Sequence, residues 1–261
     1  MLDLNYNGQL TQNYFRMEIN DFESYIDTQR FGIKTAKINS AEFLTLNTFA
    51  FLKNNDFKLV ITRVPSENIE LINFLEDNGF RLKDIQLTYK FDLGKQEINT
   101  SYLNKEINVR EGNEKDIDQL KQIAIDCFWE YGHYFADPNL KKSDCMEVYK
   151  DWTRNAVLDN NFSEKFFVAE FENKILGYLF FKLKGIEKGI YSYSGLGAVS
   201  TESRGENVFS TLVIKSLEWA KSEGHLWQEH NVLNINYPVN KVFSKLGFSN
   251  YKSETTLHAW L

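Results

Sequence analysis

The sequence predicts an α/β (α+β) protein in which a smaller, reduced α/β module precedes a larger one. Strand-like runs that alternate apolar and polar residues follow one another with helix-like runs between them, as in mixed α/β folds. A polar stretch at residues 94–116 separates two such series, and a repeated segment links them. We therefore divide the chain into modules at residues 1–93 and 108–261.

The first module contains a strand, a helix and a second strand. Residues 57–64 alternate like a strand, and residues 81–92 do so again. Between them, Ser66 is predicted to cap a helix that ends at Asn78-Gly79, since glycine commonly ends helices.

The end of this module resembles the end of the chain. Residues 74–93 and 242–261 share an apolar helix end, a Gly-Phe pair and a long strand, with the Gly-Phe pairs 168 positions apart. Helix-glycine-strand units are common, so coincidence is one interpretation. The other is that the chain holds two related α/β modules, of which the first is reduced.

The second module is predicted to begin with two helices and three strands. Glu172-Asn173-Lys174 joins the first two strands as a tight hairpin link. The predicted elements are helices at 114–127 and 143–157, strands at 165–171, 175–184 and 189–199, a helix at 206–222, a strand at 225–232, a helix at 237–245 and a last strand.

Composition narrows the class of protein. The formal net charge of −6 argues against a nucleic-acid binder, which usually carries a basic face. Cys127 and Cys145 form no CxxC motif, so we expect reduced, mostly buried thiols. The N-terminus lacks the pattern of a signal peptide, and no apolar run reaches the ~20 residues that span a bilayer. These features predict a soluble, cytoplasmic protein.

An Arg-Gly pair stands where a strand gives way to a helix, in residues 199–213. The first N–H groups of a helix are unpaired and lie at the positive end of its dipole, so this turn is suited to bind a phosphate. Gly205 would permit close approach of the backbone to such a ligand. An ordinary polar loop is the alternative interpretation.

Residues 175–261 resemble the GNAT superfamily of N-acetyltransferases. In that family an apolar strand end, a phosphate-binding turn with Arg and Gly, and a later Asn before a helix that ends in Gly-Phe bind acetyl-CoA. The resemblance implies a GNAT fold with a mixed, mostly antiparallel sheet, preceded by a degenerate half-GNAT module. It also implies acetyl-CoA as co-substrate, bound by Ala198, Val199, Arg204, Gly205, Glu206, Asn207, Val208, Phe209 and Asn236.

The two-module length and residues 133–157 are similar to one branch of the family, which contains dTDP-fucosamine acetyltransferase. The resemblance implies direct acetyl transfer, with no covalent enzyme intermediate, to a small primary amine on an amino-deoxy sugar nucleotide. An amino acid, polyamine or protein amine is the alternative acceptor. A third hypothesis is a non-catalytic relative that only binds acyl-CoA.

The sequence departs from the family pattern in two places. Asn207 stands where the motif has glycine, and the bulky Phe209 must turn its ring into the core. Phe243 stands where many members have a tyrosine that protonates the thiolate of CoA, and phenylalanine cannot donate a proton. Tyr237, at the start of the same helix, is too far along it to replace that tyrosine.

The resemblance implies that the acyl chain pairs between two splayed strands, here residues 189–199 and 225–232. Gly195 is expected to mark a bulge in the first, as is Gly197. The catalytic candidates are Glu229 and Tyr193. Glu229 and its neighbour His230 point to opposite faces, so at most one lines the cleft.

The acceptor is expected to contact His133, Tyr134, Asp137 and Tyr191. A neutral imidazole at His133 could accept the proton of an amine. The four histidines lack metal-ligand spacing, so no metal is expected. We predict no nucleic-acid or membrane partner and leave a homodimer open. Basic residues at the acceptor site would favour a nucleotide diphosphate, and acidic ones a cationic amine.

Overall fold

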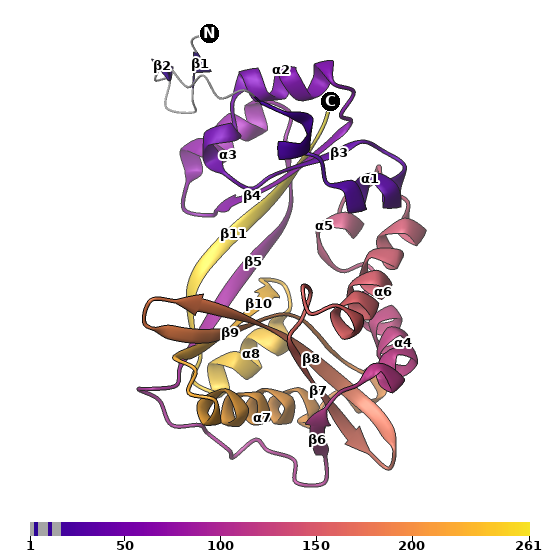
Figure 1. The fold of residues 1–261 in the computed structure, drawn as a ribbon, viewed down its shortest axis with the longest axis vertical. Coiled ribbons are helices and arrows are strands. Elements are labelled where there is room, and N and C mark those ends of the chain that lie inside the picture. The colour runs from indigo at the N-terminus through magenta and orange to yellow at the C-terminus, as the bar shows by residue number, and fades with distance from the viewer. Residues whose placement is uncertain (1–2, 5–9, 12–16) are drawn as a thin grey trace. The chain divides into compact units, whose positions relative to one another are not determined.

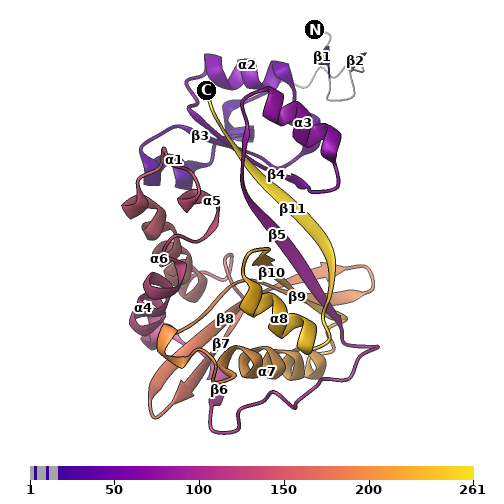
Figure 2. The ribbon, with the colours of Figure 1, turned by 180° about the vertical axis from the view of Figure 1, so that it is seen from behind.

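The computed structural model describes residues 3–4, 10–11 and 17–261, which form two compact units (Figures 1 and 2). The first unit consists of Met1–Gln86, Gly132–Cys145 and Ser253–Leu261, and the second of Leu87–Tyr131 and Met146–Lys252. Two long strands, β5 (Arg81–Asp92) and β11 (Ser249–Trp260), contribute residues to each unit, and Gly132–Cys145 of the first unit interrupts the second in the sequence. The division into modules at residues 1–93 and 108–261 remains a sequence-based prediction.

The first unit contains, besides parts of β5 and β11, short helices and strands. These are β1 (Asp3–Leu4), β2 (Leu10–Thr11), α1 (Tyr25–Phe31), β3 (Thr35–Ile38), α2 (Leu46–Asn54), β4 (Leu59–Pro65), α3 (Ile69–Asp77) and α5 (Gly132–Phe135). Strand β3 pairs parallel with β4, and the end of β11 pairs antiparallel with β4.

The second unit holds the longer elements. They are β6 (Asn108–Glu111), α4 (Ile117–Phe128), most of α6 (Lys142–Leu158), β7 (Lys165–Phe171), β8 (Lys174–Ile186), β9 (Gly189–Val199), α7 (Val208–Ser222), β10 (Trp227–Leu233) and α8 (Tyr237–Lys245). Strands β6, β7, β8 and β9 pair antiparallel in turn, and β10 pairs parallel with β9.

The strand order of the large sheet is β3-β4-β11-β5-β10-β9-β8-β7-β6. It contains parallel and antiparallel pairs, so the expectation of a mixed sheet is confirmed. Antiparallel pairing dominates where the register is defined, which also agrees with the predicted fold class.

The internal repeat extends further than the sequence indicated. The bounds of β10, α8 and β11 equal those of β4, α3 and β5 plus 168 at both ends of every element. Glycine follows the helix in both copies, with φ of 88° at Gly79 and 89° at Gly247. This strand-helix-strand correspondence supports two related α/β modules over coincidence.

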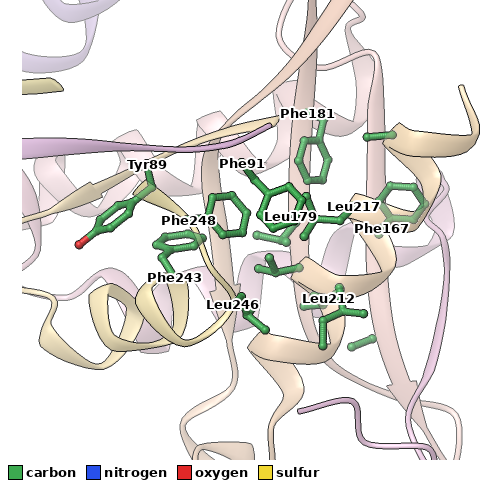
Figure 3. Packing of buried hydrophobic residues seen from close by; sticks show 14 of the residues in the cluster. Tyr89, Phe91, Phe167, Leu179, Phe181, Leu212, Leu217, Phe243, Leu246 and Phe248 are labelled. Atoms are coloured by element: carbon green, nitrogen blue, oxygen red, sulfur yellow. The ribbon is translucent and has the colours of Figure 1, made fainter. Parts of the chain in front are cut away.

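The core of the second unit lies between the sheet and helices α7 and α8. Alternate residues of β8 separate the two faces of the sheet: Leu179 and Phe181 join this core, whereas Tyr178 faces α6, where Thr153 approaches its hydroxyl at 3.3 Å. Figure 3 shows Phe243 of α8 among the aromatic side chains Tyr89 and Phe248. Close packing of this kind makes the positions of α7 and α8 sensitive to single substitutions.

Two predictions about chain reversals have different outcomes. Glu172 and Asn173 have positive φ values of 48° and 64°, which confirms the tight turn between β7 and β8. The predicted cap at Ser66 is wrong: Asn68 caps α3 by accepting a hydrogen bond from the Leu71 N–H. The Ser66 hydroxyl is instead within 2.9 Å of the Thr255 hydroxyl of β11.

The two thiols agree with a further expectation. Cys127 and Cys145 are both free, and Cys145 is fully buried, while Cys127 is half-buried. Within the described part of the chain, no helix combines the length and apolar character needed to cross a membrane.

Candidate active site

Strands β9 and β10 pair over only part of their lengths. Their parallel register runs from Ser192 opposite Gln228 to Ser194 opposite His230. Beyond it, β9 continues to Val199 and remains paired with β8, and β10 continues to Leu233. Residues 195–199 therefore present a β9 edge that β10 does not pair, which is what an extended acyl chain would require.

A bulge lies where this edge begins. Between the pairs Phe180–Leu196 and Lys182–Tyr193, β8 has one residue and β9 has two, Ser194 and Gly195. The expected bulge is thus confirmed at Gly195 and is wrong at Gly197, which pairs in regular register with Leu179. Bulges increase local twist and re-aim neighbouring side chains, so this one helps to turn β9 away from β10.

The turn between β9 and α7 has two left-handed residues. Gly205 has φ of 91°, and a side chain there would meet nothing within 4 Å. Asn207 has φ of 59° and ψ of 20°, and it precedes α7 as its N-cap residue rather than lying in the first helical turn. The predicted helix start at residue 206 is therefore two residues early, and a glycine at this position in relatives has a direct conformational reason.

The side chain of the N-cap residue Asn207 forms no capping hydrogen bond, so it leaves the first N–H groups of α7 open to another partner. Asn104 holds the turn: its side-chain amide donates to the carbonyl of Glu206, and its backbone N–H donates to the Thr211 hydroxyl. Arg204 is exposed beside this helix end. A fixed turn, open N–H groups and a nearby guanidinium together suit a diphosphate.

Cys127 of α4 lies at the same turn. Its thiol donates to the carbonyl of Val199 at 3.0 Å. Burial raises the pKa of this thiol, and the neighbouring Arg204 opposes that rise. The predicted contact residues Ala198 and Val199 are both paired with β8, opposite Tyr178 and Gly177.

Phe209 lies in the first turn of α7, and Asn236 precedes α8. The ring of Phe209 packs against the core, and its centroid lies 5.6 Å from that of Phe243. This confirms the expectation that the bulky ring turns into the core. Asn236 is the N-cap residue of α8, where its Oδ1 accepts from the Val239 N–H and its Nδ2 donates to the Tyr131 hydroxyl at 3.3 Å. Tyr131 was not predicted, since no sequence signal connects it to α8.

The two catalytic candidates are brought together. Tyr193 and Glu229 stand directly opposite each other in the parallel register, one pair before it ends, so their side chains share a face of the sheet. Glu229 is 8% exposed and accepts a hydrogen bond from the Trp227 indole at 2.7 Å. On the same face the rings of Tyr191 and Trp227 stack with centroids 4.5 Å apart.

His230 points to the other face, as the strand alternation requires. It lies in the core, 4.9 Å from the ring of Phe243, and is within 2.8 Å of the Gln228 carbonyl oxygen Oε1. Burial lowers the pKa of His230 to about 3, so it is neutral near pH 7. It therefore does not line the face that Glu229 and Tyr193 share.

Three lysines surround the aromatic side chains of that face. Lys90 Nζ is 3.8 Å from the centroid of Trp227, and Lys184 Nζ is 4.7 Å from that of Tyr193. Lys182 stands opposite Tyr193 in the β8–β9 register. Among the described residues, none of the three ammonium groups forms an ion pair or a hydrogen bond. The face thus carries three positive charges without ion-pair partners, together with the carboxylate of Glu229.

A pocket of about 190 Å³ opens on the same face beside the bulge. Its lining is mainly apolar and comes from α6, β8 and β9, including Trp152, Phe180, Lys182, Tyr193, Gly195 and Leu196. Such a volume suits a small ring or chain rather than a large ligand.

The other predicted acceptor contacts lie in the first unit, in a separate internal network. Asp137 accepts from His258 Nδ1 at 2.7 Å, and His258 Nε2 lies 2.9 Å from His133 Nδ1. Tyr134 donates to Asp27 at 3.0 Å. Tyr134 and Asp137 are each 1% exposed. Contact of His133, Tyr134 and Asp137 with an acceptor stays a prediction.

This network has a clear electrostatic character. Burial lowers the pKa of His133 well below its ordinary value, and nearby His258 lowers it further. Although burial alone would raise the pKa of Asp137, hydrogen bonds from His258 and Trp260 lower it to about 2. Burial also lowers the pKa of His258, although the hydrogen bond to Asp137 opposes that shift, so burial disfavours charge on both imidazoles beside the Asp137 carboxylate.

Comparison with known proteins finds a family match for residues 120–248. Residues 120–248 match the Acetyltransferase (GNAT) family. The spore coat polysaccharide biosynthesis protein SpsD of Bacillus subtilis (strain 168) is 25% identical over 150 residues, which are 56% of this chain and 48% of that protein. The chain thus spans about half the length of this curated relative.

Two solved structures share the fold. One is a tandem GNAT protein from the clavulanic acid biosynthesis pathway, with a TM-score of 0.59 and 13% identity over 82% of this chain and 67% of that chain. The other is a functionally unknown conserved protein from Staphylococcus epidermidis, with a TM-score of 0.59 and 12% identity over 94% of this chain and 98% of that chain. The partly unpaired β9 edge and the turn before α7 agree with this match: residues 120–248 are similar to the Acetyltransferase (GNAT) family, and the solved structures share the fold of the chain.

Proposed function

We propose that the protein transfers the acetyl group of acetyl-CoA directly to the primary amine of an amino-deoxy sugar nucleotide. The observation that carries the choice of acceptor is the lysine-aromatic face of the second unit. A diphosphate carries at least two negative charges, and unpaired lysines suit it. Stacked aromatic rings suit a nucleobase, which stacks on such rings whatever its sequence identity.

The residues proposed for acetyl-CoA are Ala198, Val199, Arg204, Gly205, Glu206, Asn207, Val208, Phe209 and Asn236. The open N–H groups of α7 and the guanidinium of Arg204 are suited to the diphosphate of the co-substrate. The unpaired edge at residues 195–199 would pair with its extended arm. Backbone N–H groups of that edge would stabilise the charge that builds on the carbonyl oxygen.

Glu229 is the proposed group that accepts the proton of the amine. Its carboxylate stands on the acceptor face beside Tyr193, although the Trp227 indole already occupies one of its oxygens. A carboxylate has further lone pairs, so a water between it and the amine can complete the path. The apolar pocket beside Gly195 would receive the sugar, whose deoxygenated carbon needs no hydrogen bond.

The name of the relative SpsD refers to polysaccharide biosynthesis, which supports a sugar-linked acceptor. The alternative is a cationic acceptor such as a polyamine. Three lysines on the acceptor face disfavour it, because like charges repel the substrate at a distance where screening is incomplete. A non-catalytic binder of acyl-CoA is the remaining alternative, and it predicts no turnover of any amine.

We expect dTDP- or UDP-linked 4-amino-4,6-dideoxy sugars to be acetylated with kcat/KM about 100-fold above that for spermidine or free lysine. Release of the CoA thiol measures the rate. In Lys90→Gln and Lys184→Gln the KM for the sugar nucleotide should rise about tenfold, the loss of one charge-assisted contact. Lys188→Gln, on the same hairpin as Lys184, should leave it unchanged. Turnover of spermidine in preference to the sugar nucleotides would contradict the proposal.

A further inference from the structure

We propose that the connector between β5 and β6, residues 93–107, is part of the acetyl-CoA site, and that Asn104 within it positions the turn at residues 204–207 for the diphosphate. This rests on the proposed function, since that turn is taken to bind the co-substrate. The contacts that the connector makes with α7 and with the turn support it.

The connector holds a defined position beside α7. Near its start, the Gln96 side chain accepts a hydrogen bond from the Asp92 N–H at 2.8 Å and donates one to the carbonyl of Gly247 at 2.7 Å. Figure 1 shows the connector passing along α7 on its way to β6. Three of its apolar side chains pack against the core beneath α7 and α8, those of Ile98, Tyr102 and Leu103.

Asn104 is connected to the chain on both sides of the left-handed residue Asn207. Its backbone N–H donates to the hydroxyl of Thr211 at 2.9 Å, and Thr211 is fully buried in the first part of α7. The Thr211 N–H in turn donates to the carbonyl of Asn207 at 2.8 Å. Before Asn207, the Nδ2 group of Asn104 donates to the carbonyl of Glu206 at 3.1 Å.

A further hydrogen bond orients the amide of Asn104. Its Oδ1 accepts from the Glu106 N–H at 3.0 Å, the arrangement of an Asx turn. Because the oxygen faces Glu106, the Nδ2 group is the one that is presented to Glu206. An aspartate at this position would keep the bond from Glu106 and lose the bond to Glu206.

The bond to Glu206 sets the direction of a peptide group in the turn. The peptide that joins Glu206 to Asn207 is trans, so its carbonyl and its N–H point in opposite directions. Since the carbonyl points to Asn104, the Asn207 N–H points away from the connector. It can then act together with the N–H groups at the start of α7 on one anion, because successive N–H groups in a turn form concavities that bind anions.

Holding the turn in this conformation favours binding. A left-handed conformation is sterically unfavourable for a residue other than glycine, and asparagine tolerates it at some cost. Asn207 has φ of 59° and forms no capping bond of its own, so contacts from elsewhere must hold it. A turn that is ordered before the ligand arrives removes an ordering cost from binding. Asn104 should therefore raise the affinity for acetyl-CoA without taking part in the chemistry.

The test is steady-state acetylation by the full chain carrying Asn104→Ala or Asn104→Asp, with calorimetric titration of acetyl-CoA. In Asn104→Ala we expect the KM and the Kd for acetyl-CoA to rise about tenfold, the loss of one hydrogen bond. The rise should be larger in Asn104→Asp, whose charge also repels the diphosphate. Because only binding is affected, kcat and the KM for the acceptor should stay within about twofold of wild type.

Asn99→Asp is the matched control. Asn99 lies in the same connector, and its Oδ1 accepts from the Ser101 N–H at 3.0 Å, as Oδ1 of Asn104 accepts from Glu106. The substitution adds the same charge and keeps this turn, so it should leave the KM for acetyl-CoA unchanged.

A truncated thioester separates the turn from the rest of the site. S-acetylpantetheine carries the acyl arm without the diphosphate, so its kcat/KM should be equal in wild type and Asn104→Ala. Equal losses with both thioesters would overturn the inference, as would an unchanged affinity for acetyl-CoA in Asn104→Ala. If wild type binds acetyl-CoA but acetylates no amine, the proposed function fails while the Kd values still test the inference. Absence of acetyl-CoA binding by wild type would overturn both.

Discussion

Gly197→Ala is expected to lower the rate of acetyl transfer about 100-fold, the effect of displacing reacting groups by about 1 Å. A Cβ atom at Gly197 would lie 2.3 Å from Cδ2 of Leu179 and 2.9 Å from the carbonyl oxygen of Tyr178. The leucine can rotate, but the carbonyl belongs to the β8 ladder. Strand β9 must therefore shift within its unpaired edge, at residues 195–199, where the acyl arm is proposed to bind.

The measurement is CoA release under saturating acetyl-CoA and acceptor, together with thermal unfolding. Overpacking should also lower the free energy of unfolding by about 1–3 kcal/mol. Gly185→Ala is the matched control, because a Cβ atom at this β8 position would meet nothing within 4 Å. A Gly197→Ala protein with the wild-type rate would show that the position of this edge does not govern the reaction.

Acidification is expected to destabilise the protein, and His230 to account for about 2 kcal/mol of the loss between pH 7 and pH 5. Burial lowers the pKa of His230 to about 3 in the folded protein. The unfolded chain has a histidine of ordinary pKa, about 6.5, and so binds a proton first as pH falls. Stability from this group is therefore complete above pH 6.5 and is lost as pH falls toward 3.

Urea unfolding of wild type and His230→Gln at pH 7.5 and pH 5.0 measures this contribution. The variant should lose about 2 kcal/mol less stability over the interval. A smaller loss should persist in it, because burial also lowers the pKa of His133 and His258. An identical loss in both proteins would contradict the assignment of His230 as a buried neutral group.

Local patterns predicted the regular elements well. The strand predicted at residues 189–199 and the helix predicted at 237–245 have the observed bounds, since alternation and apolar periodicity are local properties. The start of α7 was missed by two residues because Asn207 adopts a left-handed conformation that propensity does not reveal. Ser66 was wrongly predicted to cap the helix. Its hydroxyl instead pairs with that of Thr255, 189 positions away, and local sequence does not reveal such a tertiary contact.

The site was predictable only where a motif carried it. The resemblance placed the Arg204 turn, and strand alternation placed His230 away from Glu229. A chain of hydrogen bonds from Thr88 through Asn231 to Tyr193 joins three strands, and it depends on β5 lying next to β10. No local pattern in the sequence specifies that β5 lies beside β10 in the sheet.

The central claim is that the turn before α7 and the edge of β9 bind acetyl-CoA. The most direct measurement is a calorimetric titration of wild type and Arg204→Glu with acetyl-CoA, accompanied by thermal shift, because a ligand of the folded state raises its stability. We predict binding by wild type and a Kd about 30-fold weaker in Arg204→Glu, as one charge-assisted contact becomes a repulsive one. Equal affinities, or no binding by wild type at millimolar acetyl-CoA, would contradict the account.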